Sequence, residues 1–157
     1  MKKKMLLLFC AALLPSLHSF AQTDSLSGDW RGIWTNPAGF VLTAEMTLQA
    51  GSSCKTCAVS GNGSVQGKIV WTLRKAGSNS PGEYARNVGM TGTEYVKGEM
   101  RGSGLLVLDG YDKQDPNAII SIDKYRLAIS DTGQVIGGIT FNNGSWTGQF
   151  IAKRVEP

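Results

Sequence analysis

Short runs in which apolar and polar residues alternate are the feature that most constrains the fold of this chain. In the run Phe40–Gln49, every second residue from Phe40 to Leu48 is apolar, and apart from Val41 the residues between them are polar. A period of two is the pattern of a β-strand with one buried face. All 20 glycines lie after residue 21, where they separate such runs, and no ten-residue stretch keeps a helical period. The sequence therefore predicts an all-β fold of short strands joined by turns.

The number and order of these runs predict the architecture. We expect eight or nine strands, at 28–35, 40–49, 58–65, 68–75, 93–101, 105–111, 119–130, 135–141 and 145–155. A turn of helix is expected within 81–88, where Pro81 suits a helix start, and a polar loop over 111–117. An antiparallel meander of this size leaves two exposed edges unless it closes. We therefore predict a single antiparallel up-and-down β-barrel of about eight strands.

An internal similarity between the first and last strands supports closure. Gly28–Trp34 and Gly144–Phe150 share the pattern G-x-W-x-G-x-aromatic. In a closed up-and-down barrel these two strands pair with each other. Glycines permit the sharp bends of a small barrel, and aromatic side chains beside them fill its interior.

The first 21 residues have the organisation of an export signal. Lys2, Lys3 and Lys4 precede an apolar run over 5–14, and Ser19-Phe20-Ala21 is a small-x-small cleavage site. The apolar run is too short to cross a bilayer, which needs about 20 residues. We expect a signal peptide at 1–21 and one mature domain at 22–157. The mature protein is then periplasmic or secreted and has no transmembrane segment.

The mature composition argues against several functions. The leader holds three of the 16 basic residues and none of the 12 acidic ones, which leaves 13 against 12. A nearly neutral domain lacks the basic surface of a nucleic-acid binder, so no nucleic-acid partner is expected. The only histidine, His18, lies in the leader, which excludes a Ser-His-Asp apparatus and a His-ligated metal. We predict that the protein is not an enzyme and needs no cofactor or metal.

Two acidic patterns leave alternatives open. Asp109, Asp112 and Asp115 are spaced by three, which suits either a Ca²⁺-binding loop or a solvated acidic loop. A glycoside hydrolase needs two acids facing each other across a cleft. Acids available for such a pair are Glu45, Glu94, Glu99 and Asp123, but no spacing singles out two of them.

Cys54 and Cys57 form a C-x-x-C motif and are the only mature cysteines. In an oxidising compartment they are expected to form a structural disulfide, whose small ring stabilises the fold only modestly. A redox dithiol is the alternative. It needs the first cysteine at a helix N-terminus, whereas this motif lies in a predicted loop.

Aromatic side chains are the candidates for a ligand site. Apolar walls with a few polar groups are typical of small-ligand pockets, yet the same residues can simply fill a narrow barrel. Asp123 and Tyr125 share one face of a predicted strand, so we expect them near a cavity mouth. The candidate ligand-binding residues are Trp30, Trp34, Trp71, Tyr95, Asp123, Tyr125 and Trp146.

Gly28-Asp29-Trp30 at the start of the first strand and Arg154 at the end of the last resemble the calycin barrels: lipocalins, fatty-acid-binding proteins and avidins. Lipocalins carry a similar G-x-W, with a late basic residue packed over the tryptophan. The resemblance implies that Gly28, Trp30 and Arg154 close one barrel end. Phe40–Ala44 and Ile69–Thr72 look avidin-like, but the residues that avidins direct at biotin are not recognisable. The stretch from Asp115 to Trp146 also looks like exported bacterial barrels of unassigned function.

The resemblance implies a non-enzymatic exported binding module for a small apolar or amphipathic ligand, in a cavity of roughly a few hundred Å³. A protein-interaction module, such as an inhibitor of exported hydrolases, is the alternative. Calycin-like inhibitors of bacterial metalloproteases are small secreted barrels with one disulfide, and the opening Leu26–Trp30 is compatible with them. The cysteines of this chain are much closer together. A third hypothesis is that the protein is a structural domain associated with the cell envelope and binds no ligand.

Overall fold

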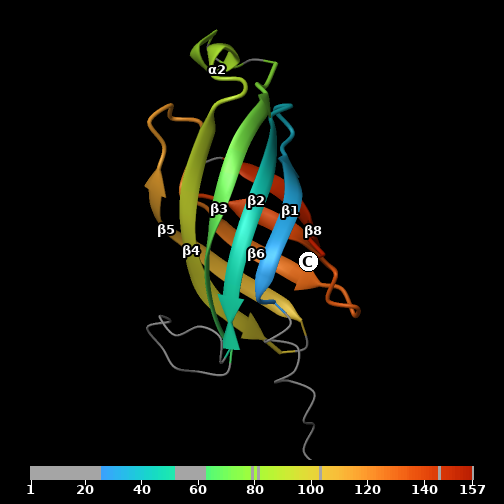
Figure 1. Ribbon diagram of the computed structural model, residues 1–157. Helices are drawn as coiled ribbons and strands as arrows, with labels where there is room; N and C mark the ends of the chain where they lie inside the picture. Colours follow the sequence, from blue (N-terminus) through green and yellow to red (C-terminus); the bar gives the residue numbers. More distant parts are fainter. Residues whose placement is uncertain are drawn as a thin grey trace, which may run out of the picture.

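The computed structural model describes residues 26–51, 63–78, 80, 82–102, 104–144 and 146–156, which form a closed antiparallel barrel (Figure 1). Each strand pairs with the next along the chain. The strands are β1 (Gly28–Thr35), β2 (Val41–Ala50), β3 (Ser64–Lys75), β4 (Thr91–Arg101), β5 (Leu105–Gln114), β6 (Lys124–Ile129), β7 (Val135–Phe141) and β8 (Thr147–Arg154). A short helix, α2 (Gly82–Arg86), lies between β3 and β4. The predicted all-β class and up-and-down order are confirmed.

The first and last strands pair, as the sequence similarity between them predicts. β1 and β8 run antiparallel, with Trp30 opposite Arg154 and Trp34 opposite Phe150. This pairing leaves the described sheet without a free edge on which another strand could add.

Alternation within each strand builds the core. In β2 the apolar residues from Leu42 to Ala50 are buried at every second position, while Glu45 and Gln49 between them are exposed. β8 repeats the pattern, with Phe150 and Ala152 buried on either side of an exposed Ile151. Because each strand buries one face, the inward side chains fill the barrel and the outward ones meet solvent.

The larger differences from the sequence prediction lie in β3, β5 and β6, whereas other strand ends differ by one or two residues. The strands predicted at 58–65 and 68–75 belong, where described, to the single strand β3. β5 continues to Gln114, so the loop predicted over 111–117 begins later. The long strand predicted at 119–130 is wrong, since only Lys124–Ile129 forms β6.

Asp115 explains the loop that replaces the start of that strand. Its two carboxylate oxygens accept hydrogen bonds from the backbone N–H groups of Ile119, at 3.0 Å, and Ile120, at 2.9 Å. These bonds hold the chain in a local turn instead of a strand ladder. Among the described residues no group of three His, Cys, Asp or Glu side chains could hold a metal ion.

The two ends of the barrel are built differently. The end at the top of Figure 1 carries α2, together with the loops between β1 and β2, β5 and β6, and β7 and β8. The other end carries the entry to β1 and the short β4–β5 and β6–β7 connections. Within the described part of the chain, no helix is both long enough and apolar enough to cross a membrane.

Candidate functional site: an aromatic and acidic pocket

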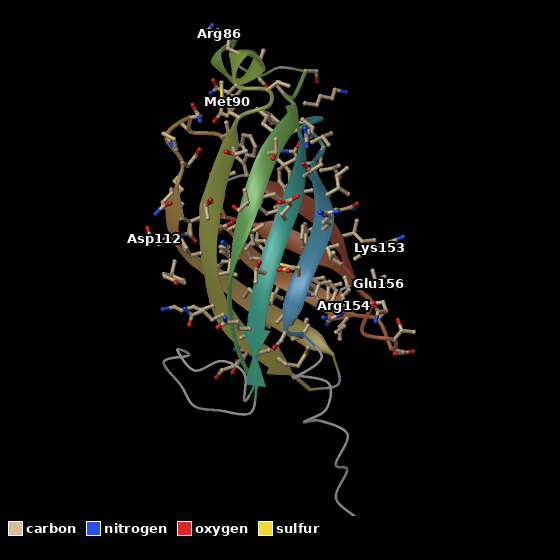
Figure 2. The ribbon with its side chains drawn as sticks, viewed as in Figure 1. Arg86, Met90, Asp112, Lys153, Arg154 and Glu156 are labelled. Atoms are coloured by element: carbon tan, nitrogen blue, oxygen red, sulfur yellow. The ribbon has the colours of Figure 1, made fainter. Side chains whose placement is uncertain are left out.

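Trp30 and Arg154 cover the barrel interior at the end away from α2. The Trp30 side chain is buried, and its Nε1 donates to the carbonyl of Leu26 at 3.1 Å. The Arg154 guanidinium lies over the indole at 4.4 Å from the ring centroid, and its Nη1 donates to the carbonyl of Ser27 at 2.7 Å. Figure 2 shows Arg154 at the end of β8, beside the lower part of β1. The cation–π contact and the two hydrogen bonds hold these two side chains against each other at this end of the barrel.

Gly28 is required by that arrangement. Its φ of +132° lies in a region that side-chain-bearing residues rarely adopt, and an added Cβ would lie 2.8 Å from Nη1 of Arg154. Both backbone conformation and space therefore favour glycine.

A pocket of about 100 Å³ opens at the opposite end, below α2. It draws side chains from four strands, from α2, and from the loops after β5 and β7. The lining residues are Trp34, Leu42, Trp71, Tyr84, Glu94, Ile119, Ile120, Ser121, Asp123, Asn142 and Trp146.

Aromatic rings form the wall of the pocket. Trp34 and Trp146 stack with ring centroids 6.3 Å apart and planes 11° apart. Phe40 packs between the loops, 4.7 Å from Trp146 and 5.6 Å from Tyr84 by ring centroids. These contacts fix the orientation of rings whose faces carry negative partial charge.

Glu94 is buried in the floor of the pocket, with 1% of its surface exposed. Its Oε2 accepts hydrogen bonds from the Tyr125 hydroxyl and, at 3.3 Å, from Nε1 of Trp71, and its Oε1 accepts from the backbone N–H of Asp123 at 2.7 Å. Burial raises the pKa of Glu94 to about 7, against the opposing effect of these donors, and the Asp123 carboxylate adds to the rise.

A β-bulge in β5 makes room for the Glu94 carboxylate. Tyr95 pairs with Asp112 and Val96 with Gly110, so Tyr111 is an extra residue on β5. A Cβ at Gly110 would lie 2.1 Å from Oε1 of Glu94, and the Gly110 N–H donates to the carbonyl of Asp123 at 2.8 Å. The bulge thus positions both acids.

Asp123, just before β6, is the second acid of the pocket. Its Oδ2 accepts from Oγ1 of Thr140 at 3.4 Å, and that hydroxyl in turn accepts from Nε1 of Trp34 at 2.7 Å. Its Oδ1 is buried and has no hydrogen-bond partner among the described residues. Burial raises the pKa of Asp123 to about 6.

Tyr125 lies beneath the two acids and is fully buried. Burial, with the nearby Glu94 and Asp123 carboxylates, raises the pKa of its phenol well above the ordinary value. The phenol is therefore neutral at physiological pH and donates a hydrogen bond to Glu94.

The structure brings most of the candidate ligand-binding residues together. Trp34, Trp71, Asp123 and Trp146 line the pocket, and Tyr125 supports it through Glu94. Trp30 lies at the other end of the barrel.

Tyr95 and the cysteines do not join this group. Tyr95 is on the outer face, where its ring packs against Tyr111 with centroids 6.4 Å apart. Its position alternates with the buried Glu94 and Val96, so the strand directs it outward. Cys54 and Cys57 lie outside the described residues.

Glu94 and Thr140 are the two buried polar residues at the site that the sequence prediction did not assign to it. Glu94 and the buried Val96 are two residues apart in β4, so their side chains point to the same face of the strand. An acid among the inward, apolar positions of a strand is unusual, and this signal identifies Glu94 as a candidate site residue. Thr140 carries no such signal, because its contacts with Trp34 and Asp123 depend on the register of three separate chain segments.

No protein-family model matches this chain, and neither a curated protein nor a solved structure matches it significantly.

Proposed function

We propose that the protein is an exported, non-enzymatic binding module that holds a small amphipathic ligand in the pocket below α2. The observation that carries this proposal is the combination of aromatic walls with two carboxyl groups at one end of an otherwise packed barrel. Convergent polar groups in an apolar pocket are the usual composition of a small-ligand site. The opposite end is covered by Trp30 and Arg154.

The size of the pocket limits the ligand. Its volume of about 100 Å³ is below the cavity of a few hundred Å³ that we expected, because buried side chains, of which Trp30, Tyr125 and Phe150 are the largest, fill the interior. Pockets for drug-sized ligands measure roughly 300–1,000 Å³. We therefore propose a ligand of a few non-hydrogen atoms, or one end of a longer molecule, instead of a whole lipid.

Two features support binding over catalysis. The mature chain holds no histidine, and both oxygens of Glu94 already accept hydrogen bonds from the protein. Because each oxygen already has a donor from the protein, the carboxyl group is held in a fixed position.

The proposal includes two further parts: that the protein is related to the calycins, and that it is exported. The closed barrel with Trp30 under Arg154 supports the relation to the calycins, and the organisation of residues 1–21 supports export. Expression with the native leader in a Gram-negative host, followed by N-terminal sequencing of the periplasmic fraction, should give Gln22 as the first residue. Retention of Met1 would contradict export.

A fluorescence titration tests the binding function. A panel of four-carbon amphipaths with a cationic, neutral or anionic head is added to the purified mature protein, and tryptophan emission is followed. We expect at least one member to change the emission saturably, because Trp34, Trp71 and Trp146 line the pocket. Ser121→Phe, at an exposed position of the lining, should abolish the response, whereas Tyr95→Phe on the outer face should keep it. No response to any member would contradict the proposal.

An exposed apolar patch favours a protein-interaction module as the second candidate. Ile33, Ile139 and Ile151 are 41%, 55% and 50% exposed on the adjacent strands β1, β7 and β8, and Ile33 pairs directly with Ile151. Contiguous exposed apolar side chains are a feature of docking surfaces. If this module inhibits an exported metalloprotease, Ile151→Lys should abolish inhibition and Ser121→Phe should leave it intact. Inhibition unaffected by Ile151→Lys would remove this patch as the docking surface.

A further inference from the structure

We propose that the pocket binds a small protonated amine, an inference that rests on the proposed function and names the chemical class of its ligand. It stands on three observations: the charge of the pocket, an unfilled hydrogen-bond acceptor, and the aromatic side chains that line the pocket.

The pocket contains acids without opposing cations. Glu94 comes from β4 and Asp123 from the loop before β6, and no lysine or arginine is among the described residues that line the pocket. Lys113, on neighbouring β5, is bound to Asp115 at 3.3 Å and to the carbonyl of Ile120 at 2.6 Å. A bound cation would relieve the repulsion between the two acids, so the charge of the site selects a positively charged group.

Asp123 supplies a carboxylate oxygen to which the described part of the protein donates no hydrogen bond. The protein fills both oxygens of Glu94, but Oδ1 of Asp123 is buried without a partner among the described residues. A buried carboxylate oxygen without a donor is unfavourable. An ammonium N–H can supply the missing donor, and a charge-assisted hydrogen bond is stronger than one from a neutral hydroxyl.

The aromatic wall suits the same ligand. Cations bind favourably over the faces of tryptophan and tyrosine, and Trp34, Trp71, Tyr84 and Trp146 all line the pocket. Its apolar lining, which includes Leu42, Ile119 and Ile120, can pack against a short alkyl chain. A small alkylammonium therefore suits the site, because its charged head can lie beside the acids and aromatic rings and its alkyl chain against the apolar lining.

Calorimetric titration with three four-carbon probes separates this inference from the proposed function. We expect n-butylammonium to bind about tenfold or more tightly than 1-butanol or butyrate at pH 8. Equal or tighter binding of 1-butanol or butyrate would overturn the amine assignment and leave the binding function standing. If none of the three binds, both proposals fail.

An Asp123→Asn variant tests the acceptor. It should weaken n-butylammonium binding about tenfold and change 1-butanol binding less than about twofold, since only the amine uses the charge. Asp112→Asn, at an exposed position of β5 that Figure 2 shows at the left edge of the barrel, is the matched control and should bind both probes as the wild type does. Equal loss for both probes would overturn the role of Asp123.

The wild-type protein provides a test that no substitution can confound. The titratable groups at the pocket are Glu94 from β4, Asp123 from the loop before β6, Tyr125 from β6 and Tyr84 from α2. Burial raises the pKa of Glu94 to about 7 and that of Asp123 to about 6, so both acids ionise between pH 5 and pH 8. An alkylammonium, like lysine, stays charged below about pH 10. Its affinity should rise about tenfold over this interval, with the affinity of 1-butanol unchanged. A flat profile for n-butylammonium would overturn the proposal.

Discussion

At the scale of single residues, the two ends of the barrel place charge beside aromatic rings for different purposes. At the end away from α2, Arg154 donates from Nη1 to the carbonyl of Ser27 and packs on Trp30, while its buried Nη2 has no partner among the described residues. At the pocket end, Oδ1 of Asp123 has no partner among the described residues, so its charge remains for a ligand.

Arg154 should therefore matter for stability. We expect Arg154→Ala to lower the free energy of unfolding by about 2 kcal/mol, because it removes a cation–π contact and a charged hydrogen bond. Lys153→Ala, at the adjacent exposed position of β8, should change it by less than about 0.5 kcal/mol. Urea denaturation followed by circular dichroism measures both. Equal effects would mean that Arg154 does not hold the closed end.

Glu94 should give the ligand-free protein an unusual pH dependence. Its pKa is raised from 4.5 to about 7 in the folded protein, so the folded state holds this proton more tightly than the unfolded state does. The resulting stability is fully present below pH 4.5 and is lost as the pH rises through 7. We expect the free energy of unfolding to fall over this interval by on the order of 2 kcal/mol. Urea denaturation of Glu94→Gln should show a flatter profile, and an unchanged profile would contradict this role.

At the scale of the elements, the bulge in β5 is the feature on which the site depends. A Cβ at Gly110 would collide with the Glu94 carboxylate, at 2.1 Å. We expect Gly110→Ala to lower the free energy of unfolding by about 1–3 kcal/mol and to weaken ligand binding. In Gly137→Ala on β7, the new Cβ would have nothing closer than 3.3 Å, so both quantities should change much less. Denaturation and titration of the two variants test this, and equal losses would contradict it.

The same element marks the limit of what the sequence could predict. β2 and the pairing of β1 with β8 follow from local alternation and from a repeated motif, so both could be predicted. The bulge at Tyr111 and the loop pinned by Asp115 depend on long-range pairing and on a side chain that binds backbone amides. The alternation of apolar and polar residues along the sequence indicates neither the bulge nor the loop. For this reason the end of β5 and the start of β6 were predicted wrongly.

At the scale of the whole molecule, closure determines where a ligand site can be. Because β1 pairs with β8, the inward side chains of the described strands face one common interior, and the pocket opens from it at the α2 end. Trp34, Trp71 and Trp146 could be proposed from aromatic composition alone. Glu94 could have been found from its place among the inward positions of β4, whereas Thr140 became recognisable only once the strand registers were known.

The four tryptophans allow one measurement of this arrangement. Each indole N–H gives a separate signal in a ¹H–¹⁵N NMR spectrum, and Trp30 at the closed end is an internal control for the three at the pocket. On titration with n-butylammonium, the signals of Trp34, Trp71 and Trp146 should shift saturably while that of Trp30 stays in place. If none of the three moves, or if Trp30 moves as far as they do, the pocket below α2 is not the binding site.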